Sequence, residues 1–141
     1  MASSAEAPRF VLPPQPQSAR RARELVADAL SARLDADTLH YTAVVVSELV
    51  TNAVIHAGTA VTVGLMLLPE GGVRLEVGDS RSWPPVPRPS SPDAVGGRGL
   101  VLVEAISRAW GMDRTDEGKI VWAEIEPALK SSRRLATNGA G

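Results

Sequence analysis

A mainly apolar stretch that polar residues interrupt at regular intervals marks the middle of the chain, over residues 44–57. Apolar residues recur there every three or four positions, and no Gly or Pro interrupts them, so the pattern predicts a helix. Glu48, Asn52 and His56 break the apolar run at four-residue intervals. Each such step turns the helix by only about 40°, so these polar side chains share one ridge. Because burying polar groups without partners is costly, the ridge predicts a ligand cavity. The alternative is a solvent-facing stripe, with His56 favoured near the helix C-terminus by the helix dipole.

The same periodicity predicts a helix before the central one, over residues 17–34. Arginines occupy one face of it, which indicates either a solvated surface or a partner-binding patch. Either Asp35 or Asp37 can cap the central helix, which we expect over residues 37–57, and Gly58 ends it. The apolar face of the earlier helix comprises Ala22, Leu25, Val26, Ala29 and Leu30.

Strand patterns lie on both sides of these helices. Residues 10–12 predict a short edge strand, because prolines follow it directly. Residues 59–68 and 73–77 flank a Pro- and Gly-containing turn, which predicts an antiparallel hairpin that ends in Gly78 and Asp79. A further short strand begins at Trp110, and residues 119–125 alternate as a final strand does.

A long stretch without periodic pattern, residues 80–95, follows the hairpin and is rich in proline. Loops of that length are usually lids, binding loops or linkers, so a lid over a ligand competes with a plain linker. Gly96-Gly97-Arg98-Gly99 comes next and opens a helix expected from Leu100. Glycines at a helix start let backbone N–H groups approach an anion, which the helix dipole also favours. Glycines also make ordinary turns, so this motif gains its meaning from its surroundings.

The length and composition of the chain limit the classes of protein to which it can belong. A chain of 141 residues suits one domain with a sizeable core, which we place at residues 9–126, between a disordered segment at 1–8 and a flexible tail at 127–141. The formal net charge of −1 gives no general electrostatic reason to bind nucleic acid or an anionic membrane. Cysteine is absent, which excludes disulfides and thiolate metal sites. No apolar run approaches the roughly 20 residues that span a bilayer, and the N-terminus lacks a secretory pattern, so we expect a cytoplasmic protein.

Several of these features can serve the binding of a nucleoside triphosphate. The side-chain oxygen of Asn52 can ligate Mg²⁺, and Glu48, one turn earlier, can accept a proton from an attacking hydroxyl. Asp79, at a strand end, can accept a hydrogen bond from the exocyclic amine of adenine. The backbone amides of Gly97–Gly99 can hold phosphates.

These motifs, taken in this order and spacing, make the chain resemble the GHKL ATPase superfamily, which includes gyrase, histidine kinases and MutL. It is most similar to the small bacterial anti-sigma-factor serine/threonine kinases and related ATP-binding regulators. The segment 48–57 resembles the N box of that family, 77–79 the start of its first glycine box, and 96–100 its second. Residues 109–111 and 118–122 resemble its closing strands, so the resemblance runs from about Phe10 to Ile125.

The resemblance implies a two-layer α/β sandwich of the Bergerat type: a mixed, mostly antiparallel sheet with helices on one face and ATP between helix and lid. It implies that Asn52 binds Mg²⁺, that Asp79 binds the adenine, and that Glu48 is the candidate catalytic base. The further nucleotide-binding positions that it implies are His56, in a supporting role, and Gly97, Arg98, Gly99 and Leu100.

The chain departs from the family pattern at two places. Residues 80–83 replace the glycine expected after the aspartate, and their bulk can narrow the adenine pocket. Ile120 stands where a base-binding threonine is expected, and a hydroxyl lost there is worth about 1 kcal/mol. We expect Trp83, Trp110 and Trp122 to pack in the core, or against the lid, rather than stack on a ligand. Trp83 is the exception to watch, because it lies in the expected lid close to Asp79.

The resemblance implies a bacterial serine/threonine protein kinase that uses MgATP to phosphorylate an anti-sigma-factor antagonist of the STAS type, that sequesters a sigma factor, or that does both. One alternative is a non-catalytic module in which the nucleotide sets how a partner is sequestered. Another is a domain that has lost nucleotide binding and only binds protein, because a fold does not fix a function. Members of this family often dimerise, so a homodimer is also an expectation.

Overall fold

A computed structural model describes residues 8–79, 95–116 and 118–127 of the chain. Most of the expected N-terminal and C-terminal segments, the expected lid up to residue 94 and Trp83 lie outside these residues. The regular elements run in the order β1 (Arg9–Leu12), α1 (Ser18–Leu30), α2 (Ala36–Ala57), β2 (Val61–Leu67), β3 (Val73–Asp79), α3 (Val95–Ile106), β4 (Ala109–Arg114) and β5 (Lys119–Ile125).

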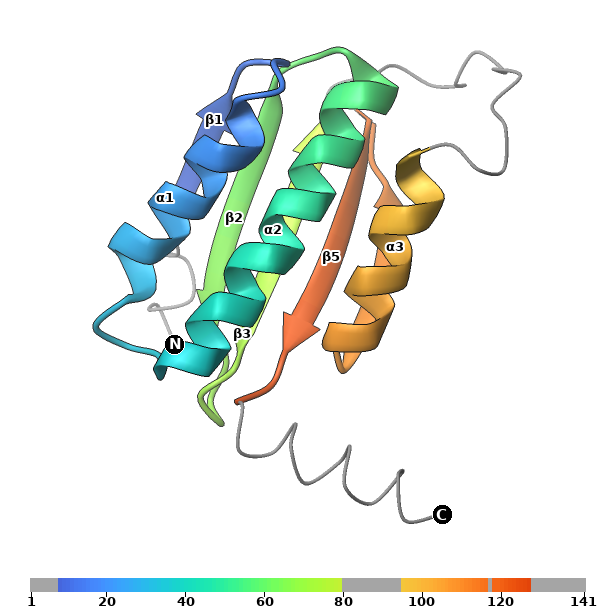
Figure 1. Cartoon of the computed structure of the whole chain (residues 1–141). Helices are drawn as coiled ribbons and strands as arrows, with labels where there is room; N and C mark the ends of the chain where they lie inside the picture. Colours follow the sequence, from blue (N-terminus) through green and yellow to red (C-terminus); the bar gives the residue numbers. More distant parts are fainter. Residues whose placement is uncertain (1–7, 80–94, 117, 128–141) are drawn as a thin grey trace, which may run out of the picture.

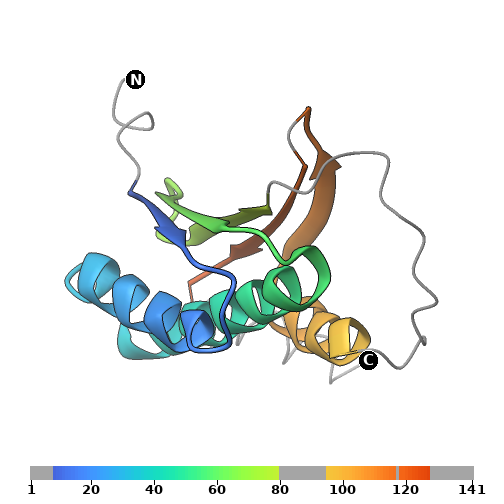
Figure 2. The same ribbon diagram turned by 90° about the horizontal axis from the view of Figure 1, so that it is seen from above.

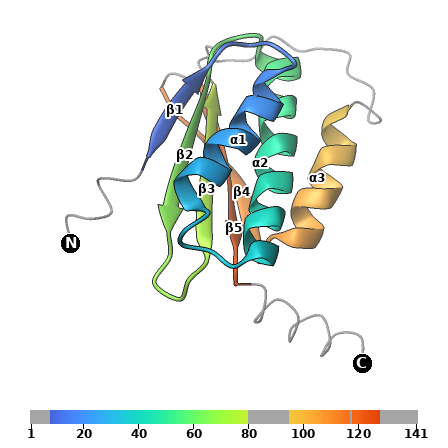
Figure 3. The same cartoon turned by 60° about the vertical axis from the view of Figure 1, so that its left-hand side comes forward.

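The strands form a five-stranded sheet in the order β1-β2-β3-β5-β4, and every neighbouring pair in it is antiparallel. Figure 2 shows α1, α2 and α3 together on one face of this sheet. Helix α2 is central, with α1 beside it over β1 and β2 and with α3 on its other side, near β5 and β4 (Figures 1 and 3). The two-layer α/β sandwich with helices on one face is therefore confirmed, and its described strand pairs are all antiparallel.

Helix α2 has a capping residue at each end. Asp35 is its N-cap: one carboxylate oxygen accepts from the backbone N–H of Thr38 at 2.8 Å, and the other accepts from the Thr38 hydroxyl at 2.9 Å. Asp37, the other candidate cap, lies inside the first turn instead. At the far end, Gly58 has a φ of 68°, a left-handed conformation that glycine adopts without steric cost.

The core lies between the helices and the inner face of the sheet. The apolar face predicted for α1 is inside it: Ala22, Val26 and Leu30 are buried, and Leu25 and Ala29 pack against the buried cluster. Alternate residues of β2, β3 and β5 face the same core, as the period of two in a strand requires. Members with almost no exposed surface include Val45, Val46, Val50, Val61, Leu65, Val73, Leu75 and Ile125.

Helix α2 is long and apolar enough to pass a test for a membrane span based on length and composition alone. The core helix of a globular domain passes the same test, so the result is weak evidence for a membrane. The packing of α2 between α1, α3 and the sheet gives its apolar residues a different explanation, because they bury against protein (Figure 1).

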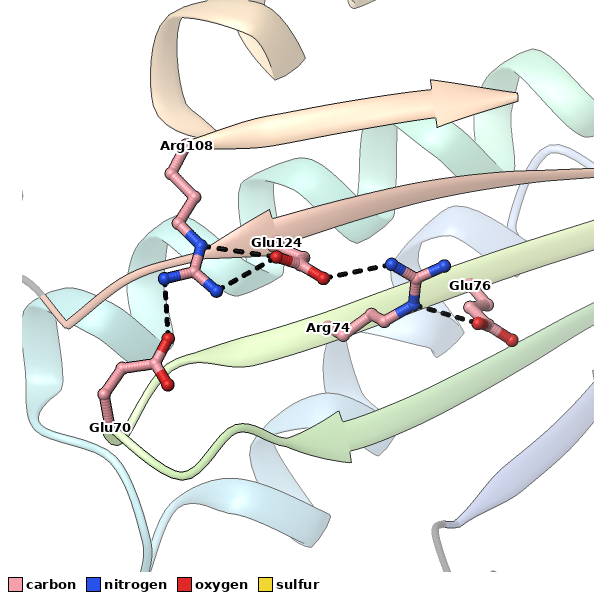
Figure 4. Close-up of polar contacts among 5 residues, drawn as sticks. All are labelled: Glu70, Arg74, Glu76, Arg108 and Glu124. Carbon is pink, nitrogen blue, oxygen red and sulfur yellow. Dashed lines mark hydrogen bonds and ion pairs between the residues drawn. The ribbon is translucent and has the colours of Figure 1, made fainter. Parts of the chain in front are cut away.

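Charged side chains cover part of the other face of the sheet (Figure 4). Arg74 binds Glu76 and Glu124 at 3.0 Å each, while Arg108 binds Glu124 at 3.0 Å and Glu70 at 2.7 Å. Burial raises the pKa of the Glu124 carboxyl, but the hydrogen bonds from Arg108 and Arg74 outweigh it and hold that pKa below its ordinary value. This network stabilises a face that carries no helix among the described elements.

Two element boundaries differ from the sequence-based expectation. Helix α1 ends at Leu30 rather than near residue 34, because the chain turns there into the Asp35 cap of α2. Helix α3 begins at Val95 rather than Leu100, so the glycine-rich motif lies inside its first turns instead of preceding it.

Candidate functional site

A pocket of about 200 Å³ lies between the helix layer and the inner face of the sheet. Its walls come from α2, α3, β3, β4 and β5, so elements from most of the chain meet there. Its lining is mainly apolar, with a few polar side chains among them. Such a lining is typical of small-molecule sites. The lining residues are Leu49, Asn52, Ala53, His56, Val77, Asp79, Leu100, Trp110, Met112, Lys119 and Val121.

Asn52 and His56 both reach this pocket from α2, which places two of the three ridge residues at one site. The side-chain oxygen of Asn52 is buried and accepts no hydrogen bond from any described residue. A buried polar atom without a partner costs roughly 1–3 kcal/mol, so its retention needs a compensating role. The amide oxygen of a residue that lines a pocket is a suitable ligand for a hard cation such as Mg²⁺, which prefers oxygen donors.

Glu48, the third ridge residue, is not part of the pocket lining among the described residues. It is half-buried and lies one helical turn before Asn52, about 6 Å along the axis. The described residues include no ion-pair partner for it. The helical ridge is therefore divided: its C-terminal two residues line the pocket, and Glu48 lies outside it.

Asp79 enters the pocket from the last position of β3, on the opposite wall from α2. Its position depends on Gly118, which is buried against it. A Cβ atom placed on Gly118 would lie 2.2 Å from the Asp79 backbone oxygen and 2.9 Å from a carboxylate oxygen. Real contacts are never this short, so only glycine permits this approach at residue 118.

Lys119 lines the pocket, whereas Ile120 does not, and this corrects the expectation that Ile120 stands beside the base. Along β5, Lys119 and Val121 share the inner face with the buried Ala123, so Ile120 points to the opposite face. Ile120 lines a second depression of about 440 Å³, together with Gly78, and Asp79 borders both hollows. The alternation of β5 already grouped Lys119 with Val121, but it did not say which face would line the pocket.

The glycine-rich motif contributes the N-terminal turns of α3. The first four backbone N–H groups of any helix have no acceptor within it. In α3, which begins at Val95, these include the N–H groups of Gly96 and Gly97. Leu100, which follows, lines the pocket directly. The side chains of residues 95–99, including Arg98, lie outside what the structure describes.

The two described tryptophans occupy opposite faces of the sheet. Trp110 packs against the core cluster, as expected, and it also lines the pocket. Trp122 lies on the outer face, where the Arg74 guanidinium is 4.4 Å from the centre of its ring. That contact is a cation–π interaction, and Trp122 is not part of the pocket.

One protein family and known individual proteins are similar to this chain. Residues 12–125 match the family described as histidine kinase-like ATPase domain. The chain is 34% identical over 96 residues to an uncharacterized protein of Streptomyces coelicolor, an alignment that covers 64% of this chain and 91% of that protein. It is also similar, at 21% identity and a TM-score of 0.47, to a histidine kinase domain from an Erythrobacter litoralis blue-light activated histidine kinase. That alignment covers 67% of this chain, which spans about half (47%) of the solved one.

Proposed function

Because this chain belongs to the family of histidine kinase-like ATPase domains, we propose that it is an MgATP-dependent serine/threonine protein kinase of the anti-sigma-factor type. Membership of the family implies ATP binding. The observation that carries the proposal beyond the family is the buried side-chain oxygen of Asn52, which has no described partner and belongs to a residue that lines the pocket. A nucleotide with its cation supplies the partner that this oxygen lacks.

The pocket suggests how ATP would lie. The Asp79 carboxylate accepts a hydrogen bond from the adenine amine, while Leu49, Val77 and Val121 provide apolar surface for the ring. The phosphates point toward the N-terminal turns of α3, whose free N–H groups and dipole favour negative charge. Asn52 would hold Mg²⁺, which would neutralise charge on the phosphate oxygens.

In the transfer step, Glu48 acts as the general base. Its carboxylate takes the proton from a serine or threonine hydroxyl of the partner as that oxygen forms a bond to the γ-phosphorus. The bond between the γ-phosphorus and the β,γ-bridging oxygen breaks, and ADP leaves. Glu48 suits this role because it lies one helical turn from Asn52, the residue that would hold the cation beside the phosphates.

Two measurements test this proposal. In calorimetric titrations, MgATP should bind the wild type and should bind Asn52→Ala and Asp79→Asn much more weakly. With a purified STAS-type anti-sigma-factor antagonist and γ-labelled ATP, Glu48→Ala should bind MgATP normally and transfer no phosphate. Absence of any nucleotide binding by the folded wild type would overturn the proposal.

A second candidate is a non-catalytic module in which the bound nucleotide controls partner sequestration. The observation in its favour is the position of Glu48, half-buried and outside the pocket lining. This candidate expects the wild type to bind MgATP, to bind its partner in a nucleotide-dependent way and to transfer no phosphate. The phosphotransfer assay therefore separates the two candidates.

The proposed partners follow from the same kinase class. They are an anti-sigma-factor antagonist as the phosphoryl acceptor and a sigma factor as the sequestered protein, both in the bacterial cytoplasm and in the control of transcription. A homodimer is part of the proposal, since related kinases often dimerise. Co-purification with a sigma factor, and molar mass by light scattering, test these points independently of phosphotransfer.

A further inference from the structure

We propose that Lys119 is a second base-recognition residue of the pocket. Its ammonium donates a hydrogen bond to an adenine ring nitrogen beside the amine that Asp79 binds. This inference rests on the proposed ATP site, and it deepens that site by assigning the chemistry that reads the base. Three observations support it: the register of the two strands, the residues that line the pocket, and the lack of an ion-pair partner for Lys119 among the described residues.

The register places the two charged residues side by side. Asp79 on β3 lies directly opposite Lys119 on β5, and both line the pocket. Residues directly opposite in an antiparallel pair have Cβ atoms about 4.5–5.5 Å apart on the same face. On its other side Asp79 faces the buried, apolar Val61 of β2. The polar neighbour of Asp79 along this row is therefore Lys119.

The ammonium group of Lys119 can donate hydrogen bonds to a ligand. An ammonium group carries three N–H donors and no acceptor. No described carboxylate forms an ion pair with it, although the row brings Asp79 next to it. The neighbouring pocket wall is apolar, formed by Val77 and Val121. Lys119 is half-buried, and an ammonium group beside such a wall gains from an acceptor brought in by a ligand.

Adenine presents the matching pattern. Its exocyclic amine donates, and the ring nitrogens N1 and N7, which lie on either side of the amine, accept. A carboxylate and an ammonium on adjacent strands therefore complement an amine and a neighbouring ring nitrogen. Through Lys119, β5 supplies the contact to the base that Ile120, on the opposite face, does not make.

The test combines a variant of the protein with single-atom variants of the ligand. Wild type, Lys119→Met and Arg114→Met are titrated with ATP, 1-deaza-ATP and 7-deaza-ATP, each of which lacks one ring acceptor. Arg114 is the matched control, because it lies opposite Lys119 on β4 and carries the same charge without lining the pocket. We expect Lys119→Met to bind ATP about tenfold more weakly, and Arg114→Met to bind it nearly as the wild type does.

The deaza analogues then identify the contact. The wild type should bind one of them about tenfold more weakly than ATP, whereas Lys119→Met should not distinguish that analogue from ATP. Lys119→Arg, which keeps a charged donor, should restore part of the discrimination. Equal binding of both analogues and ATP by the wild type would overturn the inference, as would unchanged discrimination in Lys119→Met.

Adenosine separates a base contact from a phosphate contact. If Lys119→Met weakens ATP binding but leaves adenosine binding unchanged, Lys119 contacts phosphate and the inference is wrong. If the wild type binds ATP and only the Lys119 experiments fail, the proposed ATP site stands without this residue. If the folded wild type binds no nucleotide, the proposed function and the inference fall together.

Discussion

At the scale of single residues, Asn52 shows a conflict between stability and binding. Its buried oxygen has no described partner, so the protein without nucleotide bears the cost of desolvating it. We predict that Asn52→Leu, which keeps the branched shape and the number of heavy atoms of the side chain, raises the melting temperature of the nucleotide-free protein by several degrees. The same variant should lose the rise in melting temperature that MgATP gives the wild type, measured by differential scanning fluorimetry.

The control for this prediction is Thr51→Val, another polar-to-apolar change on α2. Thr51 is half-buried and does not line the pocket, so this variant should keep the full response to MgATP. An Asn52→Leu protein that responds to MgATP as the wild type does would contradict the role assigned to the Asn52 oxygen.

Gly118 gives a second residue-scale prediction, because it determines where Asp79 can lie. In Gly118→Ala the new methyl group would overlap the Asp79 backbone oxygen, so β3 and β5 must shift at the pocket. We expect a loss of roughly 1–3 kcal/mol in the free energy of unfolding, together with a large loss of ATP affinity. Urea denaturation and calorimetry measure the two effects.

Gly64→Ala is the matched control, a glycine-to-alanine change inside β2. Its methyl group would meet only the end of the Arg9 side chain, at 3.5 Å, which is ordinary contact. That variant should bind ATP as the wild type does. Normal ATP binding by Gly118→Ala would show that Asp79 does not need its present position.

The residues of the site differ in how far the sequence reveals them. A helix repeats every 3.6 residues whatever packs on it, so the proximity of Asn52 and His56 follows from their spacing alone. The face of β5 that meets the pocket depends on its pairing with β3 and on the helices above. For this reason Lys119 was missed and Ile120 was placed beside the base. A buried oxygen without a partner, as in Asn52, is visible only in three dimensions.

At the scale of elements, the N-terminus of α2 depends on Asp35. The backbone N–H of Thr38 donates to its carboxylate and holds the pKa of that group below the ordinary value of 3.8. We predict that Asp35→Ala lowers the free energy of unfolding at pH 7 by about 1 kcal/mol, as the loss of a helix N-cap usually does. Chemical denaturation at a series of pH values measures the effect.

The sign of the pH dependence follows from that lowered pKa. A carboxyl group with a lower pKa in the folded state stabilises the fold at pH values above its unfolded pKa, near 3.8. Its contribution is lost as the pH falls through the folded pKa. The difference between wild type and Asp35→Ala should thus be constant near neutrality and shrink below about pH 4. Asp37→Ala, which removes a carboxylate from the same turn without removing the cap, should cost less.

The elements themselves were largely readable from the sequence, whereas some of their ends were not. β5 alternates over its whole length, and its bounds, Lys119–Ile125, agree with the pattern. Glycine is a poor helix former, by about 1 kcal/mol per residue relative to alanine, so the glycines of residues 96–99 predicted a helix start after them. The packing of α3 against α2 opposes that local preference, and α3 begins at Val95.

At the scale of the whole molecule, the pocket joins both layers of the sandwich. Its lining comes from α2 and α3 on one side and from β3, β4 and β5 on the other, so separating the layers destroys it. A ligand that binds only the folded protein stabilises it by about 2.7 kcal/mol at a concentration of 100 times its Kd. We therefore predict that saturating MgATP stabilises the sandwich as one cooperative unit.

Two tryptophans on opposite faces of the sheet make this prediction measurable. Trp110 lines the pocket, and Trp122 lies on the outer face beside Arg74. In variants that keep only one of them, with the other tryptophans replaced by phenylalanine, thermal unfolding followed by fluorescence should give the same midpoint at both positions. MgATP should raise both midpoints equally, together with the midpoint from far-ultraviolet circular dichroism. A rise confined to the Trp110 variant would mean that the pocket side unfolds separately, and that nucleotide stabilises only the elements that touch it.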